Sequence, residues 1–198
     1  EAIENVPTHF YHRAMLGLIA SLVELAGGRV TASEVLDLAA LPPVRRRFGF
    51  SDDDLELLQG WVVDSGVRWG LDARHRAPYG LDRIAQNTWR AGLDRILLGA
   101  AMAEDELRWV GTALPLDDVD SNDIDLAGRL AELVARLHYV LDRLRGDRPL
   151  IDWLAALSEA LDVLADVSEA DAWQLAQAQR ELAEVRTDAN EKGSNLSL

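Results

Sequence analysis

The sequence DIDLAGRLAELVARLHYVLDRL, residues 123–144, decides the fold class. Its leucines and valines recur every three or four positions, at Leu126, Leu130, Leu133, Val134, Leu137, Val140, Leu141 and Leu144. An α-helix repeats every 3.6 residues, so these side chains share one face. The spacing predicts a long amphipathic helix whose apolar face packs into a core.

The same spacing continues outward from this helix in both directions. It predicts helices over 10–26, 31–40 and 88–102, one that follows Ser51, and two that open at 147–149 and 168–171. Between them we expect a short basic turn at 44–48, an irregular loop at 66–86 and an Asp-rich loop at 111–122. No alternating run predicts a strand. We therefore expect an all-α fold of about seven helices, with antiparallel, bundle-like packing where loops are short.

Local signals support several of the helix starts. Thr31 and Glu34 have the spacing of a capping box, and Ser51 with the three following aspartates suits a helix N-terminus. Thr88 can cap the helix after it. We expect Pro149 at the first helical position, where its missing N–H has no consequence.

The length and composition indicate an ordinary globular domain. We expect one domain over residues 1–186 and a flexible tail over 187–198. There is no cysteine, and no apolar run reaches the ~20 residues that a membrane span needs. No signal-peptide pattern opens the sequence, so we expect a cytoplasmic location.

The charge balance limits the partners that this chain can bind by itself. Its net charge is -14, whereas DNA-binding surfaces are normally basic. Basic residues nevertheless gather locally, and we name as possible DNA contacts Arg45, Arg46, Arg47, Arg68, Trp69, Arg74 and Arg76. The alternative, which we favour for the cluster taken alone, is ion pairing with Asp52, Asp53, Asp54 and Asp72.

The tryptophans are the other residue type that can contact nucleic acid, because they can stack on bases. Most of the six have the spacing of core positions, and we expect four or more to be buried. Trp69, in the irregular loop, is the expected exception.

No motif of a catalytic or cofactor site is present. The glycines fit neither phosphate-binding pattern, and the zinc-protease and serine-hydrolase motifs are missing. A calcium loop that starts at Asp118 would need Gly and Glu where Asp123 and Arg129 stand. His9 and His12 can share a helix face, but we interpret them as surface residues. We therefore expect no cofactor, no metal and no catalysis by this chain.

Two segments resemble a known family. PPVRRRFGFSDDDLELLQGWVVDSGVRWGLD, residues 42–72, and QNTWRAGLDRILLGAAM, residues 86–102, look like segments of RecC, the gamma subunit of exodeoxyribonuclease V. The following LPLDD and the spacing also resemble RecC, and the likeness covers about 26–185. RecC proteins are several times longer, so the resemblance implies a fragment, similar to the helical 2B-type domain of a helicase-like protein.

The resemblance also implies a function and partners. RecC belongs to RecBCD, a complex that unwinds and degrades DNA from double-strand breaks with ATP. Within it RecC splits the duplex, guides the strands and helps to recognise Chi sequences. We therefore expect a non-catalytic RecC domain with RecB- and RecD-like partners and weak or indirect DNA contact. Two alternatives remain: a helical scaffold that makes no DNA contact of its own, and a small metal-dependent or hydrolytic enzyme.

Overall fold

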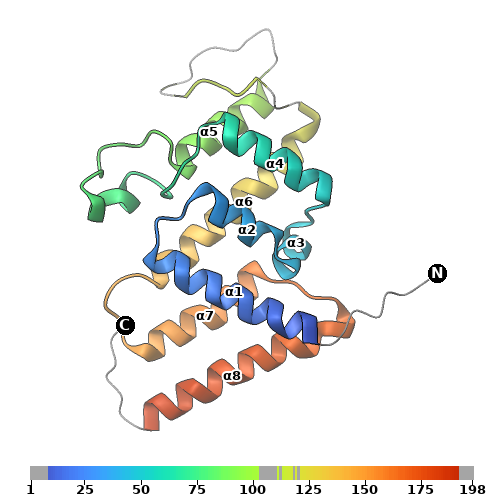
Figure 1. Ribbon diagram of the computed structural model, residues 1–198, viewed down its shortest axis with the longest axis vertical. Coiled ribbons are helices and arrows are strands. Elements are labelled where there is room, and N and C mark those ends of the chain that lie inside the picture. Colours follow the sequence, from blue (N-terminus) through green and yellow to red (C-terminus); the bar gives the residue numbers. More distant parts are fainter. Residues whose placement is uncertain (1–8, 103–110, 112, 118, 120, 192–198) are drawn as a thin grey trace, which may run out of the picture. The chain divides into compact units, whose positions relative to one another are not determined.

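The fold is built from α-helices (Figure 1). The computed structural model describes residues 9–102, 111, 113–117, 119 and 121–191. Its eight α-helices are α1 (His9–Gly27), α2 (Ala32–Ala40), α3 (Pro42–Phe48), α4 (Asp52–Asp64), α5 (Trp89–Ala101), α6 (Ile124–Arg143), α7 (Leu150–Leu164) and α8 (Ala172–Glu191). The described residues also form three short 3-10 helices, η1 (Arg74–Tyr79), η3 (Ser121–Asp123) and η4 (Glu169–Asp171). The all-α prediction is confirmed.

Three helix starts have the caps that the sequence predicts. Thr31 and Glu34 form the capping box, with the Thr31 amide donating to Glu34 Oε2 at 2.6 Å. The Ser51 hydroxyl accepts from the Asp54 amide at 3.1 Å, and the Ser51 amide donates to Asp54 at 2.9 Å. The Thr88 hydroxyl accepts from the Ala91 amide at 3.2 Å. Each such cap stabilises its helix by about 1 kcal/mol.

Helix α3 replaces the basic turn expected at 44–48. Pro42 and Pro43 stand at its first positions, where a helix needs no N–H donor. Its three arginines lie in the last turn, where the helix dipole favours positive charge. Gly49, at φ 65°, ends it in the left-handed conformation. The prediction missed α3 because a helix this short shows little periodicity.

Two other helix boundaries differ from the expected ones. Pro149 is the cap residue before α7, at φ −56° and ψ 142°, and not its first helical residue. Helix α8 is preceded by the 3-10 turn η4 and reaches Glu191, beyond the expected end at Arg186. The prediction of a single domain over 1–186 stays a prediction.

The chain divides into two compact units, and unit 1 contains residues 9–27, 41–49 and 139–191 of the described chain. Helices α7 and α8 pack against each other and run in opposite directions, and α1 contacts both (Figure 1). The Asp166 amide donates to the Pro43 carbonyl at 2.9 Å and joins α3 to the α7–α8 turn. The core of unit 1 includes the fully buried Leu18, Leu22, Leu161 and Leu164. Each buried leucine contributes about 1.5–3 kcal/mol.

Unit 2 contains residues 28–40 and the described part of 50–138. Helix α2 packs on α4, and α5 contacts η3. The fully buried residues of its core include Val35, Leu38, Leu58, Trp61, Trp89, Ile96, Leu130, Leu133 and Leu137. Unit 2 also holds the irregular loop, which an isolated β-bridge between Thr31 and Trp69 ties to the start of α2.

Among the described helices, none combines the length and the hydropathy that a bilayer-spanning segment requires.

Candidate functional site

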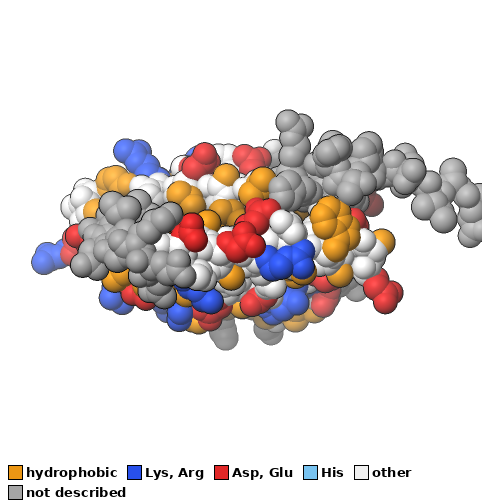
Figure 2. All heavy atoms as spheres, turned by 90° about the horizontal axis from the view of Figure 1, so that it is seen from below, with side chains coloured by type: hydrophobic (Ala, Val, Ile, Leu, Met, Phe, Trp, Pro, Cys, Tyr) orange, Lys and Arg blue, Asp and Glu red, His pale blue; other side chains and the backbone are white. Residues whose placement is uncertain are grey.

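The loop of unit 2 and the first residues of α5 form a basic segment in an acidic chain. This arginine segment, residues 66–90, has five arginines against two aspartates, so its net charge is +3. The remaining 15 basic and 32 acidic residues leave −17 elsewhere. On the face shown in Figure 2, acidic, basic and hydrophobic side chains are interspersed. Its net positive charge makes the arginine segment the best candidate in unit 2 for binding an anion.

Backbone hydrogen bonds hold the arginine segment in place. The Ala32 amide donates to the Arg68 carbonyl at 3.0 Å, and the Gly70 amide donates to the Arg29 carbonyl at 2.9 Å. The Trp89 amide, at the start of α5, donates to the Gly70 carbonyl at 2.9 Å. The segment is thus fixed both to α5 and to the residues before α2.

Arg76 is the internal anchor of the segment. It is only 3% exposed, and its guanidinium donates to four backbone carbonyls, those of Trp69 (2.6 Å), Gln86 (2.7 Å), Ile84 (3.0 Å) and Asn87 (3.1 Å). Burial away from water lowers the pKa of Arg76. The sequence proposed Arg76 as a DNA contact, but its donors point inward, so we assign it a structural role instead.

Gly70 leaves room for this anchor. Its φ of 80° is in the left-handed region, and an added Cβ would lie 2.9 Å from Arg76 Nε. Any other residue at this position would push against the buried guanidinium.

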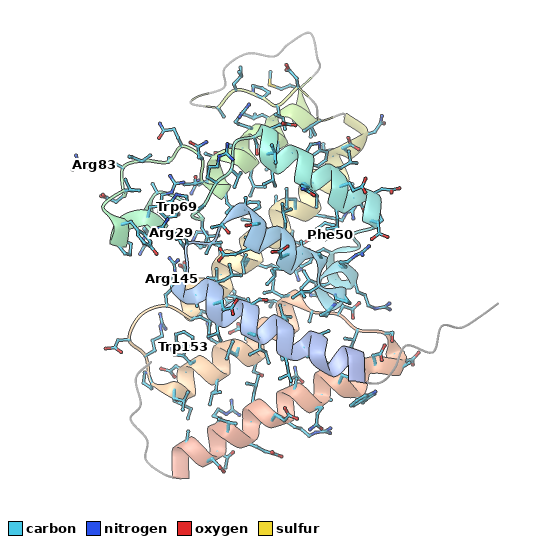
Figure 3. All side chains as sticks on the ribbon, viewed as in Figure 1. Arg29, Phe50, Trp69, Arg83, Arg145 and Trp153 are labelled. Atoms are coloured by element: carbon cyan, nitrogen blue, oxygen red, sulfur yellow. The ribbon has the colours of Figure 1, made fainter. Side chains whose placement is uncertain are left out.

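Trp69 belongs to a cluster of aromatic rings and guanidinium groups. The Arg76 Cζ lies 4.5 Å from the centre of the Trp69 ring, and the Arg29 Cζ lies 5.5 Å from it. Tyr79 meets Trp69 edge to face at 5.2 Å, and the Arg29 Cζ lies 5.4 Å from the Tyr79 ring. Arg29 and Tyr79 are exposed, whereas Trp69 is half-buried. Figure 3 shows Arg29 beside Trp69, with Arg83 further along the loop.

Five arginines in or beside the arginine segment face solvent. They are Arg29, Arg68, Arg74, Arg83 and Arg90. Within the described residues none of the five forms an ion pair. Their guanidinium groups therefore keep donors available for an anion such as a phosphate. Arg68 and Arg74 are among the predicted contacts. Sequence reasoning missed Arg29, Arg83 and Arg90, since they stand apart from one another in the sequence.

The other predicted arginines, Arg45, Arg46 and Arg47, lie on α3 in unit 1. Arg46 pairs with Asp166 at 3.3 Å, with both side chains about half exposed. Arg47 is exposed and has no ion pair in the described chain, and Arg45 is half-buried. The predicted cluster is thus divided between the two units.

Two of the aspartates proposed as partners for these arginines contact other residues instead. Asp54 pairs with Arg129 at 3.3 Å, and Asp72 accepts from the His75 amide at 2.7 Å. The hydrogen bond from the Ser51 amide is the main cause that lowers the pKa of Asp54, and Arg129 adds to it. Ion pairing with Asp54 or Asp72 therefore does not account for the arginine cluster.

The tryptophans are less buried than the sequence suggests. Of the five described tryptophans, Trp61 and Trp89 are buried, which is fewer than the four expected. Trp69 and Trp153 are half-buried, and Trp173 is 45% exposed. Trp109 lies outside the described residues. The Trp69 ring is in contact with Arg29, Arg76 and Tyr79.

No candidate metal site emerges from the part of the chain that the structure describes. Within those residues, no three His, Asp or Glu side chains gather closely enough to hold an ion. The side chains of His9 and His12, and residues Asp118 and Asp120 of the Asp-rich loop, lie outside the description.

Comparisons with known proteins place these features in a family. The family model for the fourth domain of the RecBCD enzyme subunit RecC matches residues 12–198. RecBCD enzyme subunit RecC of Mycobacterium tuberculosis (strain CDC 1551 / Oshkosh) is 52% identical over 182 residues, which cover 92% of this chain and 16% of that protein. The RecC of Mycolicibacterium smegmatis is 50% identical, covering 93% of this chain and 17% of that protein. The RecC of Escherichia coli (strain K12) is 34% identical, covering 75% of this chain and 13% of that protein.

Proposed function

Because this chain belongs to the RecC family and matches the fourth domain of its members, we propose that it serves as a non-catalytic module of a RecC subunit. The chain spans 16% of the length of the Mycobacterium tuberculosis relative. The activity of a whole RecC subunit therefore involves far more than these residues. The relatives are subunits of the RecBCD enzyme, so we propose RecB- and RecD-like proteins as partners, reached through the complete subunit in the cytoplasm.

The specific role that we propose is guidance of DNA during unwinding, in the service of Chi-regulated repair of double-strand breaks. The observation that carries it is the set of exposed arginines that form no ion pair with the residues that the structure describes, in a chain whose net charge is -14. Unpaired arginines at a surface suit phosphate contacts, because the guanidinium fork matches phosphate oxygens. The exposed Tyr79 and half-buried Trp69 beside them add surfaces on which bases can stack.

The test uses the complete RecC subunit assembled with its RecB- and RecD-like partners. Arg68 and Arg83 are changed together to glutamate, and DNA affinity is measured at several salt concentrations. Each lost phosphate contact should reduce the slope of log affinity against log salt by about 0.7–0.9. The matched control is Arg186→Glu, an exposed arginine on α8 of unit 1.

Two results would speak against DNA guidance. One is an unchanged salt slope and unwinding rate in the double variant. The other is an equal effect of Arg186→Glu, which would indicate a general charge effect. The same measurements on a variant in which Arg45, Arg46 and Arg47 are reversed test α3 as a second, separate contact.

The alternative function is that of a helical scaffold that contacts other proteins only. Leu16 and Val23 favour it, because both are nearly half exposed and lie seven positions apart on one face of α1. Under this alternative, changing both to aspartate blocks assembly of the complex, whereas the arginine reversals leave DNA binding intact. Co-purification of the partner subunits measures the first effect.

A further inference from the structure

A pocket of about 590 Å³ opens between the arginine segment and the first turns of α5. This volume lies within the ~300–1,000 Å³ typical of sites for small organic ligands. Its lining combines four alanines with polar residues, and its charged groups are Arg74, Arg90, Arg95, Asp72 and Asp94. The chemistry of these five side chains limits what the pocket can hold.

Two of the three arginines are available to an anion. Arg74 and Arg90 are exposed and form no ion pair with any described residue. Arg95 instead belongs to the wall, since its Nε donates to the Leu114 carbonyl at 3.0 Å and its Nη1 donates to the Ser65 carbonyl at 2.9 Å. The pocket therefore offers two free guanidinium groups at positions 74 and 90.

The carboxylates exclude a bare anion as the best ligand. Asp94 is exposed and lines the pocket with Arg90, one helical turn away. Asp72 has one oxygen that accepts from the His75 amide at 2.7 Å, and its other oxygen has no partner among the described residues. Inorganic phosphate has the same sign of charge as the two carboxylates, so it would be repelled by them and would leave their hydrogen-bonding capacity unused. A ligand that carries hydrogen-bond donors as well as an anion would satisfy both kinds of group.

We propose that this pocket binds a single nucleotide unit. Arg74 and Arg90 hold the phosphate, and Asp94, with the side-chain carbonyl oxygen of Gln86, accepts from the amino groups of the base. The inference deepens the proposed function on which it rests, because it names the part of a DNA strand that the arginine segment receives. A free nucleotide has the same chemistry as a nucleotide within a strand, so the experiment must separate the two sources.

Hydrogen bonds hold the backbone of the lining in place. Asn87 adopts φ 61°, and its side-chain amide donates to the Gly66 carbonyl at 2.6 Å. The Thr88 hydroxyl donates to the Ala85 carbonyl at 2.7 Å, and Arg76 holds the Gln86 carbonyl at 2.7 Å. Residues fixed in this way lose little conformational freedom when a ligand binds.

The experiment measures binding of the four deoxynucleoside monophosphates and of inorganic phosphate to the complete RecC subunit by calorimetry. We expect at least one nucleotide to bind about tenfold more tightly than phosphate. Arg74→Ala with Arg90→Ala should weaken this binding about tenfold or more, since each lost charge-assisted hydrogen bond is strong. Ala85→Trp, which fills the pocket from an exposed lining position, should weaken it likewise. The control Arg186→Ala should leave the affinity within about twofold of the original.

Three outcomes would overturn the proposal: no nucleotide binds better than phosphate, Ala85→Trp leaves nucleotide affinity unchanged, or Arg186→Ala lowers it as much as the pocket variants. Melting curves identify any variant that fails to fold. The Arg74 and Arg90 pair then serves as the second test, because both side chains are exposed.

Competition with an oligonucleotide separates the two sources of the nucleotide. Displacement of the bound nucleotide by the oligonucleotide supports a strand in the pocket, and absence of displacement overturns that part of the proposal. If the nucleotide-binding tests contradict the pocket proposal while Arg68→Glu with Arg83→Glu still weakens DNA binding, the proposed function remains intact. Nucleotide binding with no effect of the Arg68 and Arg83 variant would instead overturn DNA guidance alone.

Discussion

At the scale of single residues, Arg76 shows how one buried cation can organise an irregular loop. We expect Arg76→Met to lower the free energy of unfolding by about 2–4 kcal/mol, because the carbonyls of Trp69, Ile84 and Gln86 lose the donor that Arg76 supplies, and the Asn87 carbonyl keeps only its backbone donors. Urea unfolding followed by tryptophan fluorescence measures this loss.

Arg74→Met is the matched control for that variant. Arg74 is exposed and two positions away, so its substitution should change stability by less than about 0.5 kcal/mol. Equal losses in the two variants would contradict the anchoring role of Arg76.

Asp54 gives a second residue-level prediction, on pH. The Ser51 amide, with help from Arg129, lowers the pKa of Asp54 below its usual 3.8 in the folded chain. A lowered folded-state pKa stabilises the fold above pH 3.8, and this contribution is lost as the pH falls through the lower value. Asp54→Asn should therefore cost about 0.5–1 kcal/mol at pH 7 and less at pH 3.

Unfolding free energies of the original chain and of Asp54→Asn at both pH values measure the difference. A cost that stays the same at pH 3 and pH 7 would show that the charge of Asp54 has no part in it.

Only part of the candidate site could be predicted at this scale. The sequence names Arg68, Arg74 and Arg76 alike as possible DNA contacts, whereas in the structure Arg68 and Arg74 are exposed and Arg76 is buried. In a helix, periodicity would have separated an inward from an outward arginine. Residues 66–88 have no such period, and the acceptors of Arg76 come from carbonyls up to 11 positions away, which no local pattern indicates.

At the scale of elements, two helical glycines should respond oppositely to alanine. A Cβ on Gly60, in α4, meets no described atom within 4 Å, whereas a Cβ on Gly99, in α5, would lie 2.3 Å from the Leu116 carbonyl oxygen. Gly60→Ala should stabilise the chain by about 0.5–1 kcal/mol, because alanine has the higher helix propensity. Gly99→Ala should destabilise it by about 1–3 kcal/mol through overpacking.

Thermal melting of both variants checks this pair of expectations. A rise in melting temperature for Gly99→Ala would mean that α5 and the residues near Leu116 are not in contact in solution.

The helices themselves were largely predictable because their signals are local. The capping residues Thr31, Ser51 and Thr88 each mark a helix start that the structure contains. The long helix α6 (Ile124–Arg143) lies within one residue of its expected ends, since its apolar period is sustained over five turns. Helix α3 was missed because two prolines and three arginines give no apolar period to detect.

At the scale of the whole molecule, the net charge of -14 sets the strength and salt dependence of any DNA contact. The 198-residue chain by itself should bind DNA weakly. If the five exposed arginines in the described part of unit 2 make all of its phosphate contacts, the slope of log affinity against log salt is no steeper than about −4.5 for duplex DNA. Fluorescence anisotropy with a labelled duplex between 50 and 200 mM salt, roughly the range over which such contacts weaken, measures it.

A variant with alanine at all five of these exposed arginines of unit 2 should have a slope close to zero. These positions are Arg29, Arg68, Arg74, Arg83 and Arg90. A slope that persists in this variant would mean that the chain contacts DNA through some other surface.

The inward-facing carbonyls around Arg76 have a consequence for how this loop can evolve. Four of its backbone acceptors, at Trp69, Ile84, Gln86 and Asn87, are already occupied. An incoming polypeptide therefore finds little main chain with which to extend a β-ladder, and recognition at this surface depends on side chains. Substitutions at exposed positions of the loop can then change which ligand it binds, while the backbone beneath keeps its conformation.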